Sequence, residues 1–315
     1  MAPSKPKYIM PAEWEPHEAT WLGWPHNSSD WPGKIAAIHF VYGEIVKKIA
    51  AGETVRIIVN DEKHEAKARG ILNKVGVDPT VVEFFRIPTD RGWTRDFGPI
   101  FVRRGKTTAI AGFRFNAWAK YSDHKKDAKV AEKLARKLKK EYRPVLHNGK
   151  PFVLEGGAID VNGQGTLITT EECLLDQTIQ VRNPGVSRKE YEKVLHESLG
   201  ATNVLWLNKG IAGDDTHGHV DDLCRFVNER TVVLCRESDP NDPNYHLLEE
   251  NRERLEGFKL ENGSRIHTEF LPMPAPLYYR GQRLPASYAN FLITNAAVLV
   301  PTFNDPNDRI ALGTL

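Results

Sequence analysis

The sequence predicts an α/β fold built from repeated units, of the propeller kind or another repeat architecture. Four segments consist of a β-rich run, a short polar turn and a second β-rich run, as expected of β-hairpins. The hairpins start at intervals of roughly 60 residues, which is typical of a repeated supersecondary unit. Stretches with helical periodicity lie between them. Hairpins and helices are therefore expected to alternate along the chain.

Short polar turns place the four hairpins. Their first β-rich runs cover residues 100–102, 158–161, 224–227 and 291–293, with turns near Arg104-Gly105, Asn162-Gly163, Asn228-Glu229 and Asn295. One further interval would put the next equivalent position at about residue 350, beyond Leu315. We therefore expect the last repeat within residues 1–315 to be incomplete.

Three stretches between the hairpins show the apolar spacing of amphipathic helices. They cover residues 125–143, 187–199 and 245–255. In the first, Val130, Leu134 and Leu138 recur at intervals of four among basic residues, which indicates a solvated outer face rather than a nucleic-acid surface. The second begins with Ser187 and carries Glu190 three residues later, as in a capping box.

Composition and charge favour an ordinary globular protein. Of the 315 residues, 40% are hydrophobic and 27% are charged, and the formal net charge is +2. This balance argues against nucleic acid or an anionic lipid surface as the main partner, because both require a strong positive field. The longest nearly apolar run, residues 291–300, is about half of the roughly 20 residues that a membrane-spanning helix needs. No membrane contact is expected, and homo-oligomer formation is left open.

The pattern favours a single domain over residues 1–315, with residues 1–10 as an extended N-terminal tail. Prolines in this tail favour extended backbone, and it has no apolar region of the kind that a secretory signal carries. A cytoplasmic location is therefore expected. Cys173, Cys224 and Cys235 form no CxxC pair, so we expect small buried hydrophobic residues rather than disulfides or a zinc finger.

An acidic residue precedes each of three predicted hairpins. These residues are Asp96, Glu155 and Asp221, each about four positions before its first strand core. If the repeats surround an axis, equivalent positions meet near that axis. Neighbouring glycines, such as Gly157 and Gly218, would let backbone approach a ligand closely. Converging carboxylates predict a binding site for a cation.

Two kinds of cation fit this prediction. A planar guanidinium can pair bidentately with carboxylates, Trp93 can cover it by cation–π attraction, and His219 can carry protons. A metal ion is the rival, because nitrogen and oxygen donors are dense around the third acidic position. These donors are Asp214, Asp215, His217, His219, Asp221 and Asp222.

Each acidic residue also has a purely structural explanation. Asp96 can pair with the neighbouring Arg95 or cap a turn. Glu155 can accept hydrogen bonds from the two glycine amides that follow it. Asp221 or Asp222 can cap the structure after a loop. The matching position ahead of three hairpins favours a shared site over three separate local roles.

The combination of five stretches resembles the agmatine deiminase family, which includes the Porphyromonas-type peptidyl-arginine deiminases and belongs to the pentein superfamily. The stretches are residues 21–25, 93–99, 154–157 with 170–175, 213–222 and 287–291. They occur in the family's order from near residue 8 to near residue 308. The set is far more specific than any one motif.

The resemblance implies a five-bladed α/β propeller of ββαβ modules with an axial active site. It also implies hydrolysis of agmatine to N-carbamoylputrescine and ammonia, a step toward putrescine, without a metal or organic cofactor. In that chemistry a cysteine thiolate attacks the guanidinium carbon, ammonia leaves, and water hydrolyses an S-alkylthiouronium intermediate.

The resemblance also assigns roles by position. Asp96 and Asp221 would grip the guanidinium, and Trp93 would form a wall of the pocket. Glu155 and His219 would handle protons. Asp214 takes the place of an acidic residue that helps to hold the substrate.

The chain departs from the family in its nucleophile. The family's cysteine ends a Gly-rich stretch near the C-terminus in His-Cys, and the 315 residues contain no such stretch. Cys173, Cys224 and Cys235 do not occupy its place. We therefore expect the 315-residue chain to be inactive by itself, with an open last blade that exposes strand edges or apolar surface.

Because the loop 213–217 differs from that of relatives, the sequence does not decide which group the substrate carries at the end away from its guanidinium. The loop is one residue shorter than in plant relatives, and His217 and Asp222 stand where asparagine is frequent. Agmatine, peptidyl-arginine or another guanidino compound therefore fits. Two alternatives belong to other functional classes. One is a metal-dependent hydrolase that uses His217, His219 and the surrounding aspartates, and the other is a non-catalytic binder of guanidinium or polyamine.

Overall fold

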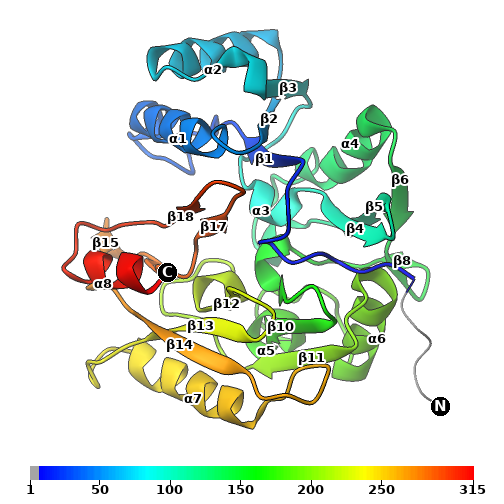
Figure 1. The fold of residues 1–315 in the computed structure, drawn as a ribbon, viewed down its shortest axis with the longest axis vertical. Helices are drawn as coiled ribbons and strands as arrows, with labels where there is room; N and C mark the ends of the chain where they lie inside the picture. Colours follow the sequence, from blue (N-terminus) through cyan, green and yellow to red (C-terminus); the bar gives the residue numbers. More distant parts are fainter. Residues whose placement is uncertain (1–6) are drawn as a thin grey trace.

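The computed structural model describes residues 7–315, which form an α/β structure with the longer helices at its periphery (Figure 1). Four sheets of three strands each account for most of the strand residues described. Three shorter hairpins join them: β7 (Leu146–His147) with β8 (Lys150–Pro151), β15 (Tyr278–Tyr279) with β16 (Gln282–Arg283), and β17 (Leu292–Ile293) with β18 (Val298–Leu299).

Three of the sheets are built as ββαβ modules. The first contains β4 (Ile100–Arg104), β5 (Thr107–Gly112), α4 (Val130–Leu138) and β6 (Glu141–Pro144). The second contains β9 (Asp160–Val161), β10 (Thr166–Thr170), α5 (Glu171–Leu175), α6 (Arg188–Leu199) and β11 (Asn203–Leu207). The third contains β12 (Cys224–Phe226), β13 (Thr231–Arg236), α7 (Asn244–Gly257) and β14 (His267–Pro272).

Each module has the same strand directions. The first two strands pair antiparallel through the predicted turn, and the third runs parallel to the second after the helical crossover. A parallel neighbour needs such a crossover, because a tight turn can only return the chain antiparallel. All four predicted hairpins are therefore confirmed, since β17 and β18 also pair antiparallel around Asn295.

The N-terminal sheet differs from the modules. Its strands β1 (Ala19–Gly23), β2 (Thr54–Val59) and β3 (Val82–Arg86) are all parallel and are joined by α1 (Ile35–Ile49) and α2 (Glu62–Lys74). Leu292 and Leu299 of the last hairpin pack against the core of this sheet. The first sheet and the last hairpin, which are far apart in the sequence, therefore share one core, and Figure 1 draws the tip of this hairpin near β1.

Two of the three predicted helices are confirmed, and the third is shorter than predicted. Helix α6 begins after Ser187, whose backbone N–H donates to the Glu190 carboxylate at 2.8 Å in the expected capping box. Helix α7 encloses residues 245–255. The prediction of a helix over 125–143 was wrong at both ends. Helix α4 begins at Val130, after a short 3-10 helix at Asp127–Lys129, and it stops at Leu138, because Lys139 adopts a left-handed φ of 53°. The residues beyond it pair with β5 instead.

The described part of the N-terminal tail is docked on the first module. Tyr8 is buried, and Ile9 exchanges two backbone hydrogen bonds with Arg103, of 2.9 and 2.8 Å. Residues 1–6 of the predicted tail lie outside the described residues.

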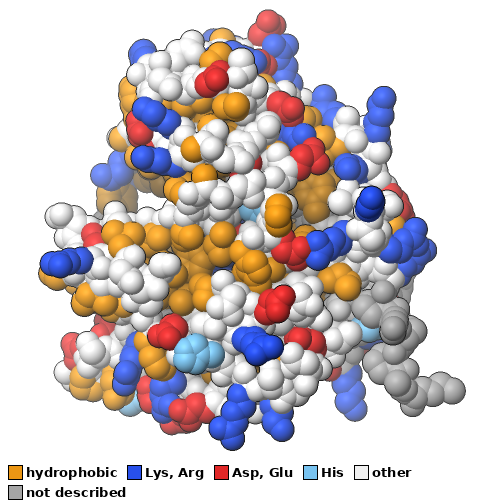
Figure 2. Space-filling model, viewed as in Figure 1, with side chains coloured by type: hydrophobic (Ala, Val, Ile, Leu, Met, Phe, Trp, Pro, Cys, Tyr) orange, Lys and Arg blue, Asp and Glu red, His pale blue; other side chains and the backbone are white. Residues whose placement is uncertain are grey.

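Most large apolar side chains are buried, and several are exposed at the surface. In residues 7–315 no helix is both long enough and apolar enough to cross a membrane. Exposed large hydrophobic side chains occur on α1, β15, β18 and α8 (Asn307–Thr314). Figure 2 shows hydrophobic side chains gathered in the part of the view that contains the last hairpin and α8 in Figure 1.

Candidate active site

The three acidic residues lie on, or directly before, short helical turns that precede the first strand of each module. Asp96 is on α3 (Thr94–Phe97), Glu155 precedes the turn Gly156–Ala158, and Asp221 is on the turn Val220–Asp222. The first turn contacts the second, and the second contacts the third. Because the modules present equivalent turns to one another, carboxylates more than 50 residues apart in sequence meet at one place.

His219 is the centre of this group. Its Nδ1 lies 3.7 Å from Oδ1 of Asp96 and 3.9 Å from Oδ1 of Asp221. Its Nε2 lies 3.7 Å from Oε2 of Glu155. All four side chains are buried. The structure thus brings together Asp96, Glu155, His219 and Asp221.

Gly157 is required for this close approach. A Cβ atom at this position would lie 2.5 Å from Nδ1 of His219 and 2.8 Å from Oδ1 of Asp96. The Gly157 backbone N–H donates to Oδ1 of Asp96 at 3.1 Å. A side chain at residue 157 would therefore push the imidazole and the carboxylate out of place.

Asp96 is held through its second oxygen by Trp118. The indole Nε1 of Trp118 donates to Oδ2 at 3.1 Å, and both side chains are buried. Trp118 lies in a segment of left-handed backbone, which is rare for residues other than glycine. The φ values are 52° for Ala117, 59° for Trp118 and 53° for Ala119. Such left-handed residues other than glycine are strained and are concentrated at functional sites. Burial raises the pKa of the Asp96 carboxyl to about 6, although the nearby His219 opposes the rise.

Glu155 has an arginine partner that is not evident in the sequence. Nε of Arg182 lies 3.2 Å from Oε1 of Glu155, and both side chains are fully excluded from solvent. Arg182 also donates to the carbonyl oxygens of Gln180, at 2.9 Å, and of Thr216. Burial alone would raise the pKa of Glu155, but the charges of Arg182 and His219 outweigh it and lower the pKa to about 2.

The electrostatic surroundings favour a protonated His219. Burial acts to lower the pKa of the imidazole, but Asp96, Cys173 and Glu155 together act more strongly in the opposite direction, so that the pKa lies well above its ordinary value. An imidazolium beside an ionised Glu155 is a proton donor next to a proton acceptor. The arrangement can therefore protonate a leaving group and then accept a proton from water.

Asp221 is connected to a buried charge network. Oδ2 of Asp221 lies 4.0 Å from Nε of Arg95, and Arg95 pairs with Glu13 at 2.8 Å. Glu13 also pairs with the buried Arg225 at 3.0 Å, which contacts Asp160 at 3.3 Å. The local pairing of Arg95 with Asp96 that the sequence left open is not formed, because Arg95 turns to Glu13 instead. Asp222 accepts a hydrogen bond from Asn290 at 2.8 Å.

Other sequence-predicted residues lie outside the group. Asp214 closes its own loop by accepting backbone N–H bonds from Gly218 and His219 at 2.7 and 3.0 Å. Nε2 of His217 pairs with Asp176 at 2.8 Å. Trp93 lies against Trp31, with ring centroids 5.4 Å apart, and its place in a pocket wall stays a prediction.

The donor set that the metal alternative requires is not assembled. In residues 7–315 the group of three donors with metal-ligand spacing is Glu155, Cys173 and His219, and it contains neither His217 nor an aspartate. The sequence therefore missed Cys173 as a neighbour of the site. Its burial among hydrophobic residues was predicted correctly, since Cys173 belongs to the core cluster that contains Leu174 and Tyr191, but its Sγ also lies beside Glu155 and His219.

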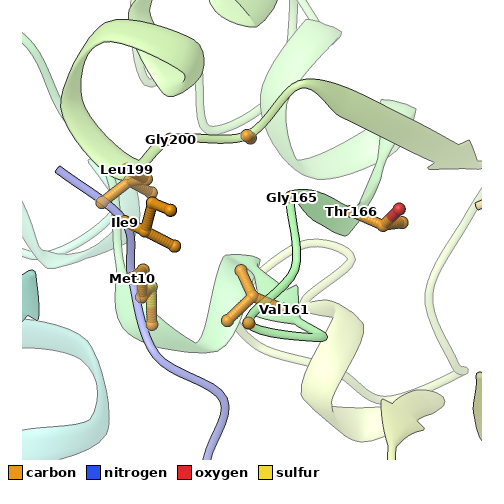
Figure 3. A pocket seen from close by; sticks show the side chains of 9 residues that line it. Ile9, Met10, Val161, Gly165, Thr166, Leu199 and Gly200 are labelled. Atoms are coloured by element: carbon orange, nitrogen blue, oxygen red, sulfur yellow. The ribbon is translucent and has the colours of Figure 1, made fainter. Parts of the chain in front are cut away.

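A separate small pocket lies between the docked N-terminal segment and the second module (Figure 3). Ile9, Met10 and Leu199 lie on one side, and Val161, Gly165 and Thr166 lie on the other. No charged side chain lines it. This pocket therefore offers a guanidinium no carboxylate partner.

Repeated ββαβ modules with an acidic residue ahead of each first strand and one central histidine define a protein of the pentein class. Residues 9–315 match the Porphyromonas-type peptidyl-arginine deiminase family. The chain belongs to this family.

Named relatives and solved structures agree with that assignment. An agmatine deiminase of Stutzerimonas stutzeri (strain A1501) is 36% identical over 331 residues, which cover 97% of this chain and 86% of the relative. A solved agmatine deiminase of C. jejuni with substrate bound is 33% identical with a TM-score of 0.85, covering 98% of this chain and 86% of that one. A solved agmatine deiminase of Enterococcus faecalis is 30% identical with a TM-score of 0.86, covering 98% and 87%.

Proposed function

We propose that this protein is an agmatine deiminase, which hydrolyses the guanidinium group of agmatine to N-carbamoylputrescine and ammonia. The observation that carries this proposal is the position of His219, whose ring nitrogens lie 3.7–3.9 Å from Asp96, Glu155 and Asp221 of three different modules. A buried group of carboxylates around one imidazole suits a planar cation that must be both bound and protonated. The relatives named agmatine deiminase support the same activity.

In the proposed complex, Asp96 and Asp221 accept hydrogen bonds from the N–H groups of the guanidinium. Trp118 and Gly157 keep the Asp96 carboxylate in one orientation, because each donates to a different oxygen. A fixed carboxylate loses little conformational freedom on binding, which favours affinity. Trp93 as a wall of the pocket and Asp214 at the substrate's far end complete the proposed contacts.

Glu155 and His219 are the proposed proton-handling pair. The imidazolium of His219 donates a proton to the nitrogen that leaves as ammonia. Arg182 holds Oε1 of Glu155, so that Oε2 is the oxygen that faces the imidazole. The pair then takes a proton from the attacking water, which restores the starting protonation of the site.

The covalent step requires a cysteine thiolate as nucleophile. We assign this role to none of Cys173, Cys224 and Cys235, so the absence of a nucleophile within these 315 residues stays a prediction. Substrate binding and turnover are therefore separate questions for this chain. Binding requires only the carboxylates, whereas ammonia release requires the thiolate as well.

We further propose that residues 1–315 are one domain whose repeated units are the blades of a five-bladed propeller. Three ββαβ modules, the parallel sheet β1–β3 and the hairpin β17–β18 account for five units. Contacts of Leu292 and Leu299 with the first sheet support a closed ring. The axial position of the three acidic turns is the reason that their carboxylates meet.

Calorimetry with agmatine, arginine, a peptidyl-arginine and putrescine tests the proposed substrate. We expect agmatine to bind most tightly, and putrescine, which lacks the guanidinium, to bind weakly. Asp96→Asn is expected to weaken agmatine binding at least about thirtyfold, because it removes one charge of a buried pair. Asp239→Asn, a substitution of the same kind at an exposed aspartate, is the matched control.

Different results would identify different functions. Tighter binding of the peptide than of agmatine would replace agmatine by peptidyl-arginine as the substrate. Equal binding of putrescine and agmatine would overturn a guanidinium site. Ammonia release, measured in parallel, separates an active deiminase from a binder without turnover.

A further inference from the structure

Three different metal-ligand atoms meet beside the proposed guanidinium site. A carboxylate oxygen of Glu155, Sγ of Cys173 and a ring nitrogen of His219 lie within 4.8 Å of one another, and all three residues are buried. We propose that these residues form a Zn²⁺ site through which the metal reversibly blocks the proposed active site. The effect on agmatine rests on the proposed function, whereas binding of the metal does not.

Two of the three ligands have atoms without hydrogen-bond partners. Oε2 of Glu155 and Nε2 of His219 are buried and make no hydrogen bond within residues 7–315. A buried polar atom without a partner costs about 1–3 kcal/mol, so such atoms usually indicate a missing ligand or water. The two atoms lie 3.7 Å apart, which is too long for a hydrogen bond between them.

This separation suits one tetrahedral ion. Zinc bonds of about 2.0–2.1 Å to nitrogen and oxygen place two ligands of the same ion about 3.3 Å apart. A movement of a few tenths of an ångström would therefore bring both atoms into the coordination sphere. Three protein ligands leave a fourth position for water, as is common at zinc sites that are not purely structural.

The chemistry of the ligands selects zinc over magnesium or calcium. A thiolate and an imidazole are soft or borderline ligands that favour Zn²⁺, whereas Mg²⁺ and Ca²⁺ prefer oxygen ligands. The surrounding charge also favours a cation, because Asp96 and Asp221 lie 3.7 and 3.9 Å from the same imidazole. Arg182 neutralises only one oxygen of Glu155.

The backbone and neighbouring side chains hold the ligands in place. Cys173 lies on α5, whose cap Thr170 accepts a hydrogen bond from the Cys173 backbone N–H at 3.1 Å. Arg182 holds Oε1 of Glu155, whereas His219 faces Oε2. Such supporting contacts orient metal ligands and increase affinity. The site is therefore largely formed without the ion.

An ion at this position would interfere with the proposed reaction in a specific way. It would replace the proton on Nε2 of His219 and the thiol proton of Cys173, both of which are released to solvent, and it would occupy Oε2 of Glu155. Nε2 and Oε2 are the atoms proposed to transfer protons. A bound Zn²⁺ would also repel the guanidinium cation from Asp96 and Asp221. Zinc and agmatine should therefore exclude one another, although they contact different atoms.

Titration of the metal-free 315-residue chain with Co²⁺ tests the site directly. We expect one Co²⁺ per chain, with the absorption of thiolate-to-cobalt charge transfer, and displacement by one Zn²⁺. Cys173→Ala should abolish this absorption and weaken Zn²⁺ binding at least about tenfold. Cys224→Ala is the matched control, because Cys224 is equally buried but lies outside the group.

The absence of the charge-transfer band, its persistence in Cys173→Ala, or its loss in Cys224→Ala would overturn the proposal. X-ray absorption at the zinc edge of the unmodified chain keeps the test valid if a variant does not fold. One sulfur at about 2.3 Å with nitrogen and oxygen at about 2.0–2.1 Å is expected. A first shell without sulfur would overturn the site.

Calorimetry separates this inference from the proposed function. Agmatine titrated into the zinc-loaded chain should bind at least about tenfold more weakly than into the metal-free chain when Zn²⁺ is about ten times above its dissociation constant. Zinc binding through Cys173 with no agmatine binding to the metal-free chain would retain the metal site and reject the function. Unchanged agmatine affinity in the zinc-loaded chain would reject the blocking role.

Discussion

Arg182 and Glu155 form an ion pair from which solvent is completely excluded, with 3.2 Å between Nε and Oε1. The two residues come from different loops, and the pair connects the second module with the loop of Thr216 through a further hydrogen bond of Arg182. Loss of one partner leaves the other charge buried and unpaired. The pair therefore determines both the orientation of Glu155 and the stability of the site.

Replacement of Arg182 is expected to be strongly destabilising. Arg182→Gln should lower the free energy of unfolding by about 3–5 kcal/mol, because Glu155 loses its counter-charge. The double variant Arg182→Gln with Glu155→Gln should recover part of this loss. Urea denaturation measures all three variants. Arg136→Gln, at an exposed pair with Glu132, should cost less than about 0.5 kcal/mol, and an equal loss there would contradict the argument.

The Trp118 hydrogen bond to Asp96 should affect ligand affinity. Trp118→Phe keeps the aromatic ring but removes the N–H donor, and a bond to a charged group contributes about 1.5–3 kcal/mol. We therefore expect agmatine to bind roughly tenfold to a hundredfold more weakly in calorimetry. Trp206→Phe removes a similar indole bond to Glu192 at 3.0 Å outside the site, and its agmatine affinity should not change. Equal losses in both variants would indicate a general effect on folding.

Asn295 connects the two ends of the described chain. Its side chain accepts from the His17 backbone N–H at 2.9 Å and donates to the carbonyl oxygens of His17 and Gly52 at 2.9 and 3.3 Å. Asn295→Ala should lower the free energy of unfolding by about 1–3 kcal/mol, since each bond contributes about 1 kcal/mol. Asn73→Ala, at an exposed asparagine of α2 with ordinary helical backbone, should not lower it by more than about 0.5 kcal/mol. A neutral effect of Asn295→Ala would show that the hairpin is held by its apolar contacts alone.

Asp127 predicts a measurable dependence of stability on pH. Its buried carboxylate accepts backbone N–H bonds from Asp90 and Arg91 at 2.7 and 3.2 Å, yet burial raises its pKa from 3.8 to about 7. The folded protein therefore holds a proton that the unfolded chain releases between these values. The contribution of Asp127 to stability should be fully present below the unfolded pKa and decline, by up to about 4 kcal/mol, as pH rises to about 7.

Asp127→Asn is expected to remove this part of the pH dependence, because the amide oxygen still accepts a backbone bond but does not titrate. The difference in unfolding free energy between the parent and the variant, measured from acid to neutral pH, is the relevant quantity. Asp239→Asn, at an exposed position, should follow the parent. A constant difference between parent and Asp127→Asn would show that Asp127 does not titrate in this range.

The sequence predicted the elements whose cause is local. Each hairpin depends on alternating β-rich residues and a turn such as Asn162-Gly163, and the capping box of α6 depends on Ser187 and Glu190. The predicted C-terminal boundary of the helix that became α4 was wrong, because the conformation of residues 139–143 depends on a distant strand rather than on local sequence. Pairing of β6 with β5 satisfies backbone groups that a longer helix would have satisfied internally.

The parallel sheet β1–β3 was not predicted for a related reason. Its strands pair in order across two helical crossovers, so that no tight turn between them identifies the pairs in the sequence. The hydrophobic pattern indicates buried strands, but it does not indicate which strand lies beside which. Only the packing of α1 and α2 against the sheet decides this.

The sequence by itself determined the family, the hairpins and the acidic positions Asp96, Glu155 and Asp221, because turn residues, alternation and motif order are properties of neighbouring residues. The tertiary structure alone decided which side chains support these positions. Arg182 and Trp118 reach the group from segments outside the matched stretches, and the position of Cys173 within its stretch does not indicate that its thiol faces Glu155 and His219. The physical reason is that burial and charge act through space, so the pKa values and partners of these groups depend on distances that no local pattern fixes.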